Sequence, residues 1–326
     1  MTVTETVQKA MALWGFEGAE CRLIAERENR VFRVDHKGKA CALRLHRLGY
    51  RTDGELWSEL EWMRSLAKGG MHVPAPIPSA SGKFLHLVDG IQVDVLTWLS
   101  GDPVGKTGEP LEIDDRAELF SGMGGEMARM HLLTDTWAPP EGFIRCAWNR
   151  AGLVGENPVW DRFWDNPTLS NEDRALFLKV RQVADLELQR LEPELDYGLI
   201  HADLVRENIL VDGDRLQLID FDDSGFGFRL FDLGTILLKA LDEPDYPELR
   251  TALIEGYKSV RDIDLAALEL FILLRSATYV GWIITRMEED GSESRNKKFI
   301  SNTRKLAKNY LAGLEDPSRK ASKGKP

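Results

Sequence analysis

The stretch LIHADLVRENILVDGDRLQLIDFDDSGFG, from Leu199 to Gly227, decides the fold because it alternates short apolar runs with charged residues. NILVDGDRLQLIDF within it predicts a β-hairpin with Asp212 and Gly213 in the turn, since Asp-Gly between two alternating runs favours a tight turn. Together with the preceding apolar run YGLIHADL, the hairpin predicts polar side chains at the ends of apolar strands: His201, Asp203, Asn208 and Asp220.

This combination of side chains suits phosphoryl transfer. That chemistry needs a carboxylate to orient the attacking hydroxyl, and oxygen ligands for the divalent ions that neutralise the β- and γ-phosphates. The alternative interpretation is a charged surface loop with His201 as a core histidine. The combined pattern, His-x-Asp-x4-Asn and then a hairpin that ends in Asp-Phe-Asp, favours the phosphoryl-transfer site.

Composition narrows the class of protein. The chain has 326 residues, 43% of them hydrophobic, and 53 acidic residues against 42 basic ones give a net charge of -11. This composition predicts a soluble folded protein and disfavours binding to nucleic acid or anionic membrane. Three cysteines without metal-ligand spacing support neither a disulfide framework nor a zinc site.

No secretion signal or membrane span is expected. The N-terminus lacks a basic segment followed by an apolar core, and the longest apolar stretch, residues 265–287, is interrupted by Glu269 and Arg275. A buried helix and a cytoplasmic location are therefore expected.

The first hundred residues predict a small mixed sheet with one helix. Two hairpins are expected, one over residues 29–47 with a Lys-Gly turn and one over residues 83–99 around Asp89-Gly90. Between them, residues 53–68 predict a helix that stops at Gly69 and Gly70.

The remainder of the chain is expected to be mainly helical. Helices are predicted over 114–133, 172–192, 247–260, 264–289 and 296–312, with an ordered surface excursion over 141–167. The predicted organisation is an N-terminal nucleotide-binding lobe (1–98), a C-terminal catalytic and acceptor-binding lobe (99–313) and a disordered tail (314–326).

Two segments resemble a known family. HADLVRENILV is similar to the catalytic loop, and LIDFDDSGFGFRLFDLGTIL to the metal-binding segment, of the kinase-like phosphotransferases that include aminoglycoside phosphotransferases, choline kinases and type II homoserine kinases. The resemblance covers most of residues 20–285. It implies an α+β, two-lobed protein-kinase-like fold with a small β-rich N-terminal lobe and a larger helical C-terminal lobe, and the use of ATP and Mg²⁺.

The resemblance also implies roles for individual residues. Asp203 becomes the catalytic aspartate, and Asn208 and Asp220 become metal ligands. Asp222 is a further candidate ligand, because strand alternation would return it to the side of Asp220. Two more residues support the loop: His201, as a brace that does not titrate in the reaction, and Asp232, which either accepts hydrogen bonds from the loop backbone or is a plain first-turn helix acid.

A kinase also needs a cation for the α- and β-phosphates and a carboxylate on the helix behind it. ACALRLHR is similar to the third strand of the family, but Arg44 stands where a lysine is usual. Its partner is expected to be Glu59, which lies nearest the apolar helix face formed by Leu56, Leu60, Met63 and Ala67. The alternative for Arg44 is an outward-facing strand arginine.

The expected phosphate loop, IAERENRVFRV, contains no glycine. Backbone N–H groups around Glu28, Asn29 and Arg30 would have to form the phosphate cradle. The adenine is expected to lie between two pairs of apolar side chains and to meet the backbone of a connecting segment: Val31, Ala42, Leu210, Ile219, Thr97 and Trp98.

On the acceptor side, Arg275 lies in an apolar helix, with Tyr279 and Trp282 on the same face. A buried arginine needs a partner, either a protein carboxylate or the carboxylate of an acceptor, and the first is the stronger expectation. The aromatic residues of the excursion either wall an acceptor pocket or form core: Trp148, Trp160, Phe163 and Trp164.

The sequence therefore predicts an ATP- and magnesium-dependent small-molecule kinase. The acceptor would be a hydroxyl of an amino alcohol, a hydroxy amino acid or an aminoglycoside-like compound. Two alternatives stay open, a bacterial stress-response-type protein Ser/Thr kinase and a catalytically silent nucleotide-binding regulator. The sequence leaves the oligomeric state undetermined.

Overall fold

The computed structural model describes residues 3–26 and 29–315, which divide into two compact units. Unit 1 comprises residues 1–112, 132–145 and 206–223, and unit 2 comprises 113–131, 146–205 and 224–326. Each unit is made of several separate stretches of the chain, so this division does not correspond to a single boundary. The predicted lobe boundary at residue 98 stays a prediction.

Unit 1 contains a five-stranded antiparallel sheet in the order β1-β2-β3-β5-β4. The strands and the two helices of this part of the unit are α1 (Val3–Leu13), β1 (Glu20–Glu26), β2 (Asn29–His36), β3 (Lys39–His46), α2 (Asp53–Lys68), β4 (Leu85–Val88) and β5 (Ile91–Thr97). Both predicted hairpins are present. Lys37, Gly38, Asp89 and Gly90 all adopt positive φ, as their two-residue turns require.

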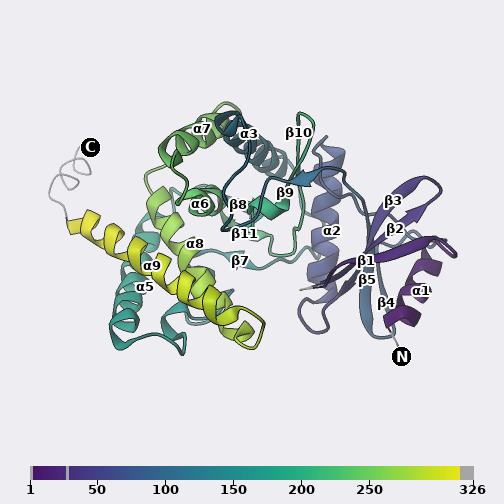
Figure 1. Cartoon of the computed structure of the whole chain (residues 1–326), viewed down its shortest axis with the longest axis horizontal. Helices are drawn as coiled ribbons and strands as arrows, with labels where there is room; N and C mark the ends of the chain where they lie inside the picture. The colour runs from purple at the N-terminus through teal and green to yellow at the C-terminus, as the bar shows by residue number, and fades with distance from the viewer. Residues whose placement is uncertain (1–2, 27–28, 316–326) are drawn as a thin grey trace. The chain divides into compact units, whose positions relative to one another are not determined.

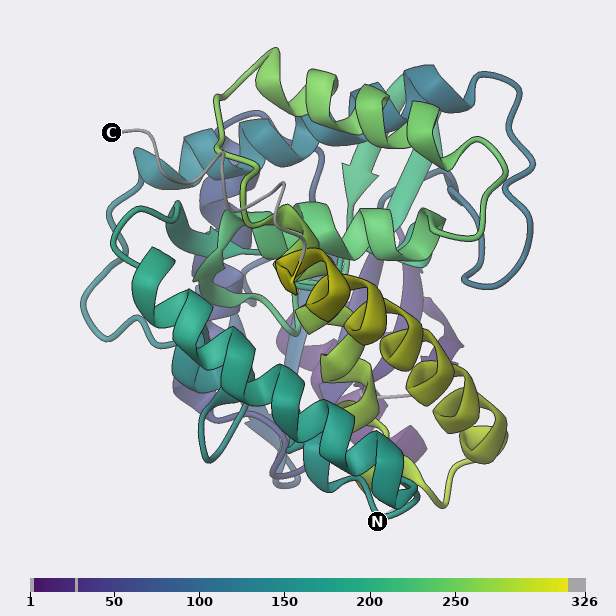
Figure 2. The same cartoon turned by 90° about the vertical axis from the view of Figure 1, so that its left-hand side faces the viewer.

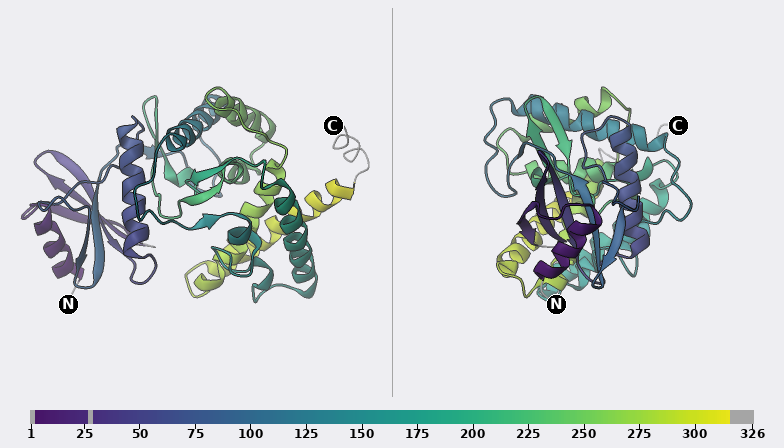
Figure 3. Two further views of the ribbon diagram at one scale, coloured as in Figure 1. Left: turned by 180° about the vertical axis from the view of Figure 1, so that it is seen from behind. Right: turned by 90° about the vertical axis from the view of Figure 1, so that its right-hand side faces the viewer.

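The two faces of this sheet differ in chemistry. Val34, Leu43 and Val95 point to one face and form a core with α1, whereas Ala42 and Arg44 point to the opposite face by strand alternation. Figures 1 and 3 show α1 and α2 on opposite sides of the sheet. Arg44 is therefore directed towards α2, as its ion pair with Glu59 confirms.

Helix α2 begins and ends where the sequence predicts. Thr52 and Glu55 form a reciprocal capping box, and the helix ends at Gly69, followed by Gly70 with φ of 86°. Leu56 and Leu60 are fully buried on its inner face. The side chain of Glu59 is fully buried as well, so α2 carries a charge into the interior of unit 1.

The second sheet of unit 1 contains the hairpin predicted from the opening stretch. Its order is β10-β9-β6, with β6 at Asp102–Pro103, β9 at Ile209–Asp212 and β10 at Arg215–Leu218. Asp212 pairs with Arg215, so the turn residues are Gly213 and Asp214, one position later than predicted. A short 3₁₀ helix, η2 (Arg206–Asn208), precedes the hairpin.

Unit 2 is mainly helical and also holds a small sheet in the order β7-β11-β8. Figure 2 shows its long helices α5 (teal) and α9 (yellow) running in a similar direction, and α9 packs against both α5 and α8. Its elements are most of α3 (Arg116–Asp135), β7 (Ala147–Trp148), α4 (Arg150–Val154), η1 (Phe163–Asp165), α5 (Asn171–Leu191), β8 (Tyr197–Ile200), β11 (Gly225–Phe228), α6 (Arg229–Ala240), α7 (Tyr246–Lys258), α8 (Leu268–Trp282), η3 (Ile284–Arg286) and α9 (Ser292–Glu315).

Helix α8 is the central helix of this unit. Leu268, Phe271 and Ala277 are fully buried, and α6 and α9 pack against the helix. A segment that contains α8, Leu268–Arg286, is the one stretch of the described chain that is long and apolar enough to cross a membrane, but 72% of its apolar window is buried within the protein. Its apolar character is thus explained by its place in the core.

Two expectations about unit 2 need correction. The excursion over 141–167 lies only partly on the surface: Glu141, Glu156 and Asp165 are exposed, but the aromatic side chains of Trp148, Phe163 and Trp164 are almost completely buried. Residues 314 and 315, expected in the tail, form the end of α9, and residues 316–326 lie outside the described part of the chain.

Candidate active site

Arg44 lies at the centre of a buried charge network in unit 1. Its Nη1 donates to Glu59 Oε1 at 2.8 Å, while Nε and Nη2 grip the two carboxylate oxygens of Asp94 on β5, each at 2.8 Å. Asp94 also accepts a 2.7 Å hydrogen bond from His46. The ion pair with Glu59 is the one predicted, and the alternative of an outward-facing arginine is wrong, because Arg44 is only 6% exposed.

The network stays charged because its members compensate for one another. Burial alone would lower the pKa of Arg44, but Asp94 and Glu59 raise it well above its usual value. Burial likewise opposes ionisation of Glu59 and Asp94, yet Arg44 and the other nearby cations hold the pKa of both carboxyls below their usual values. The site therefore contains two buried carboxylates and a buried guanidinium.

Asp94 and His46 were not predicted as site residues. The alternation of IQVDVLT places Asp94 among apolar residues, which is a weak signal. Its pairing with Arg44 depends on β3 and β5 being neighbours, which the sequence did not specify.

The four apolar residues expected around the adenine lie in two parts of unit 1. Val31 and Ala42 lie on the sheet face of Arg44, since Val31 pairs with Arg44 and Ala42 pairs with Arg33 across β2 and β3. Leu210 and Ile219 belong to the β9–β10 hairpin region of the same unit; Leu210 is buried and Ile219 is half-buried. An adenine sandwich between these two pairs stays a prediction.

The backbone of the connection after β5 makes hydrogen bonds within unit 1, and its predicted contact with the nucleotide stays a prediction. The N–H of Thr97 donates to Ala75 O at 2.8 Å, and the N–H of Trp98 donates to Ala40 O at 3.4 Å. These donors are already used within unit 1. At the expected phosphate loop, the Asn29 side chain is hydrogen bonded to His46 at 3.1 Å, and the predicted position Glu28 lies outside the described residues.

The candidate metal ligands Asn208 and Asp220 lie next to one ladder of unit 1. The N–H of Ile219 donates to the carbonyl of Asn208 at 3.0 Å, which extends the β9–β10 pairing by one residue pair. Asn208 is buried and Asp220 is exposed. Asp220 has φ of 65°, a conformation that costs free energy for a non-glycine residue and is concentrated at functional sites.

Asp222 is placed by a turn, so its assignment by strand alternation was wrong. Strand β10 ends at Leu218, and Asp222 and Asp223 form a turn before β11. The Asp222 side chain is almost completely buried, and its Oδ1 has no hydrogen-bond partner among the described residues. Burial, and then the charge of Glu59, raise the pKa of the Asp222 carboxyl.

A buried carboxyl group with one oxygen free of hydrogen bonds to the described residues fits a divalent cation, which would compensate the charge that burial disfavours. The described residues contain no ready cluster of three His, Cys, Asp or Glu side chains for a metal. Mg²⁺ is commonly held by one or two carboxylates together with waters and substrate phosphates. The carboxylates of Asp220 and Asp222 and the amide of Asn208 are compatible with such a site.

The His-x-Asp loop of unit 2 is held by Asp232. The carboxylate of Asp232, in the first turn of α6, accepts from the backbone N–H of His201 at 2.9 Å and of Ala202 at 2.7 Å. The hydrogen bonds predicted for Asp232 are thus present. Ala202 has φ of 66°, so the loop adopts a strained turn that Asp232 stabilises.

Two histidines complete this support. His201 is fully buried, and its Nδ1 accepts from the N–H of Asp203 at 3.3 Å, which agrees with a bracing role. His131, which was not predicted, lies 3.1 Å from Asp232 through Nε2. Burial, and then Arg229, lower the pKa of His131 to about 4, so it is neutral near pH 7.

The partner of the buried Arg275 is Asp203 itself. Arg275 Nη2 donates to Asp203 Oδ1 at 2.5 Å and to the Tyr279 hydroxyl at 2.8 Å. The guanidinium lies over the rings of Trp160 and Tyr279, at 4.6 Å and 4.3 Å from their centroids. A protein carboxylate is therefore the partner, as expected, and it is the carboxylate with the predicted catalytic role.

The aromatic residues of the excursion form the core beneath this pair. Trp148 stacks on Phe231 and meets Trp160 edge to face, and Trp160 contacts Tyr279. Trp160 Nε1 and Arg275 Nε have no hydrogen-bond partner within the described ranges. The cluster is thus core that reaches Asp203 through Arg275.

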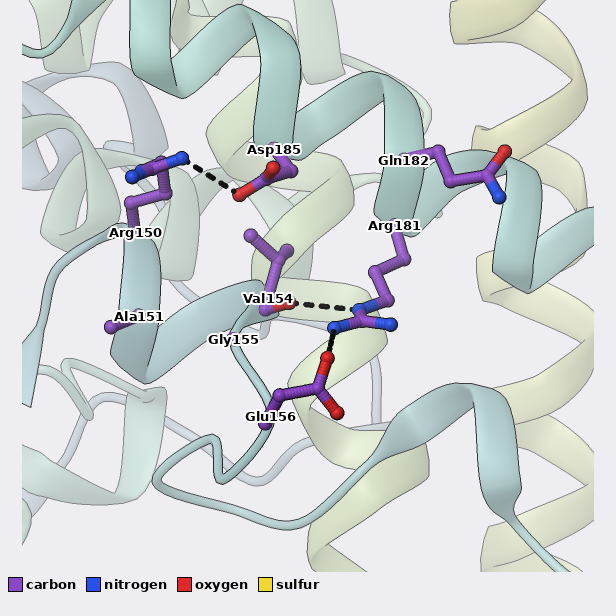
Figure 4. A pocket seen from close by; sticks show the side chains of 8 residues that line it. All are labelled: Arg150, Ala151, Val154, Gly155, Glu156, Arg181, Gln182 and Asp185. Carbon is purple, nitrogen blue, oxygen red and sulfur yellow. Dashed lines mark hydrogen bonds and ion pairs between the residues drawn. The ribbon is translucent and has the colours of Figure 1, made fainter.

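A cavity of about 400 Å³ lies elsewhere in unit 2, between α4 and α5. Figure 4 shows its two arginines directed at partners of their own, Arg150 at Asp185 and Arg181 at Glu156 and the Val154 carbonyl. None of the predicted site residues lines this cavity, so it contributes no group to the candidate active site.

The buried Arg–Glu pair between a strand and a helix and the braced His-x-Asp loop are features expected of a kinase-like phosphotransferase. A model described as the phosphotransferase enzyme family (APH) matches residues 20–271. This match covers most of the chain, and the chain belongs to that family.

Individual relatives agree with this assignment. Amicoumacin kinase of Bacillus subtilis (strain 168) is 27% identical over 94% of this chain and 92% of its own length, and homoserine kinase of Agrobacterium fabrum (strain C58) is 28% identical over 69% and 66%. The solved structure of a microcompartment-associated aminopropanol kinase aligns with 95% of this chain and 98% of its own, with a TM-score of 0.83 and 26% identity. The predicted α+β, protein-kinase-like fold and phosphotransferase class are confirmed.

Proposed function

We propose that this protein transfers the γ-phosphoryl group of ATP to a hydroxyl of a small molecule, with Mg²⁺ as the divalent ion. The observation that carries the proposal is the braced loop, in which Asp232 holds the backbone on which Asp203 is presented. Asp203 would accept the proton of the acceptor hydroxyl. The hydroxyl oxygen would bond to the γ-phosphorus of ATP while the bond between the γ-phosphorus and the β–γ bridging oxygen breaks, and ADP would leave.

The metal would be held by Asn208 and Asp220, with Asp222 as a further ligand, and would neutralise charge on the β- and γ-phosphates. Support comes from the backbone hydrogen bond that joins Asn208 to Ile219 and from Asp222 Oδ1, which has no hydrogen-bond partner among the described residues.

Arg44 would contact the phosphates while Glu59 holds it. A guanidinium has five N–H bonds, and three of those of Arg44 are committed to Asp94 and Glu59, which leaves two for phosphate oxygens. A lysine has only three N–H bonds in all. The additional carboxylate Asp94 thus gives a physical reason for an arginine at this position.

The acceptor is proposed to be an amino alcohol, a hydroxy amino acid or an aminoglycoside-like compound. The kinases to which this chain is similar are named for acceptors that differ, amicoumacin, homoserine and aminopropanol, so similarity alone does not choose among them. Arg275 and Tyr279, which contact each other beside Asp203, are proposed to contribute to acceptor recognition. A cytoplasmic location without nucleic-acid or membrane partners belongs to the same proposal and is supported by the net charge of -11.

An acceptor screen tests the proposal. The full chain is incubated with Mg-ATP and one of 1-amino-2-propanol, ethanolamine, homoserine, other hydroxylated amino acids or amino sugars, and ADP release is measured together with the mass of the phosphorylated product. We expect acceptor-dependent ADP release with at least one class. Phosphorylated protein bands from a lysate, with no small-molecule product, would instead favour a protein kinase. Failure to bind Mg-ATP would contradict the proposal altogether.

A further inference from the structure

Arg145 links the metal-binding segment of unit 1 to helix α2. Its Nη2 donates to the carbonyls of Phe221 at 3.1 Å and Asp222 at 2.6 Å, and its Nη1 donates to the carbonyl of Glu55 on α2 at 3.0 Å. The same Nη1 lies 3.5 Å from Glu59 Oε2. The Arg145 side chain is 1% exposed, so these contacts are shielded from water.

A second arginine grips the same segment. Arg51 Nη2 donates to the carbonyl of Asp222 and to Asp223 Oδ1, each at 3.0 Å. Its Nη1 lies 3.9 Å from Glu55 Oε1, at the first turn of α2. Two guanidinium groups therefore converge on the carbonyl of Asp222 from the side of α2.

The contacts made by Arg145 have a selective pattern. Three of its hydrogen bonds go to main-chain carbonyls, two of them at Phe221 and Asp222, so they fix the backbone around Asp222. Asp222 Oδ1 keeps no partner within the described residues. The Asp222 carboxylate is thus held in place on a fixed backbone and stays available to a cation.

Arg145 and Arg51 also offset the repulsion between neighbouring carboxylates. Asp222, Asp223, Glu55 and Glu59 all lie in or beside the segment that packs on α2, and Arg145 and Arg51 lie between these acidic groups and contact both sides. Without Arg145, the Asp222 turn and the Glu59 turn of α2 would repel each other. The segment before Arg145 is itself attached to α2, because the N–H of Ile144 donates to Ser58 Oγ at 2.8 Å.

We propose that Arg145 is a positioning residue for the divalent cation: it fixes the turn that carries Asp222 against the helix that carries Glu59. The assignment rests on the proposed function and adds to it a residue outside the catalytic loop, the hairpin and the strand that carries Arg44. Arg51 has the same role to a lesser degree, because it is more exposed, with a side chain 11% accessible. Partners that orient metal ligands without touching the metal usually change metal affinity by about 10- to 100-fold when replaced.

The test measures metal affinity rather than turnover. Mn²⁺ is titrated into the full chain in the presence of AMP-PNP, and free Mn²⁺ is followed by electron paramagnetic resonance; AMP-PNP affinity without metal is measured separately by calorimetry. For Arg145→Met we expect Mn²⁺ affinity to fall about 10- to 100-fold, while AMP-PNP affinity without metal stays within about twofold.

Arg150→Met is the matched control, because Arg150 is a half-buried arginine five positions further on that pairs with Asp185 at 3.2 Å in unit 2. Its Mn²⁺ affinity should equal that of the wild type. Arg145→Lys keeps the charge and is the substitute variant if Arg145→Met does not fold. Because the single nitrogen of lysine cannot reach all three carbonyls, we expect its Mn²⁺ affinity to fall about tenfold.

Two results would overturn the assignment and are distinguishable from each other. A folded Arg145→Met or Arg145→Lys variant with wild-type Mn²⁺ affinity would make Arg145 a purely structural residue. A wild-type chain that binds no Mn²⁺ with AMP-PNP would overturn the proposed function and the assignment together.

Discussion

Arg44→Lys is conservative in charge and should nevertheless destabilise unit 1. Lysine has one nitrogen, which cannot hold both oxygens of Asp94 and also reach Glu59, whereas Arg44 makes all three contacts at 2.8 Å. At least one charge-assisted contact to a buried carboxylate is lost, and such a contact contributes about 1.5–3 kcal/mol. His46 still holds Asp94 and Arg145 still lies near Glu59, so the loss should not exceed that range.

The assay is thermal and urea unfolding of the full chain at neutral pH. The expected loss corresponds to a fall in Tm of about 4–10 °C for a unit of this size. Arg33→Lys is the matched control on the adjacent strand: Arg33 grips Asp35 through two nitrogens in the same way, but its side chain is 29% exposed and the pair is solvent-screened. That variant should change Tm little.

A double-mutant cycle tests whether the lost contact with Asp94 causes the destabilisation by Arg44→Lys. Asp94→Asn removes the charge that requires the bidentate grip, so Arg44→Lys should cost less in that background, with a coupling free energy of at least about 1 kcal/mol. The reasoning is refuted if Arg44→Lys shifts Tm no more than Arg33→Lys, or if the two substitutions are additive.

Three further predictions concern single groups. Asp222→Asn should raise the stability of the metal-free protein by about 1 kcal/mol at neutral pH, because it removes a carboxyl group whose ionisation burial and Glu59 oppose, and should weaken Mn²⁺ binding; both are measured by unfolding with and without metal. Asp232→Ala should lower kcat by at least about tenfold and Tm by several degrees, because two backbone N–H groups of the loop lose their acceptor; an unchanged kcat would contradict this. His131, with its pKa lowered from 6.5 to about 4, should make stability fall as pH drops from 6.5 to 4, by up to about 3 kcal/mol, because only the unfolded chain takes up the proton there; a His131→Gln variant should show a flatter pH dependence.

The parts of the fold that depend on local chemistry could be predicted from the sequence. The hairpin turns at Lys37-Gly38 and Asp89-Gly90 and the end of α2 at Gly69 follow from the conformations that neighbouring residues allow. The pairing of Arg44 with Glu59 could also be predicted, because helical periodicity assigns Glu59 to the inner face of α2.

The rest of the site depends on contacts between distant segments. Asp94 and Arg145 reach their partners only through the order of strands in the sheet and through a connection 90 residues from Glu55. Asp222 was assigned by strand alternation, which failed because the strand ends at Leu218 and Asp220 adopts a positive φ. The residues immediately around Leu218 and Asp220 indicate neither the end of the strand nor the positive φ.

The most direct test of the central claim is phosphoryl transfer by Asp203→Asn. With an acceptor from the screen and saturating Mg-ATP, we predict a fall in kcat of at least about 1000-fold, with Mn²⁺ and AMP-PNP affinities close to those of the wild type, because Asp203 serves the acceptor hydroxyl and not the nucleotide. An Asp203→Asn enzyme that keeps kcat within about tenfold of the wild type would contradict a catalytic role for Asp203.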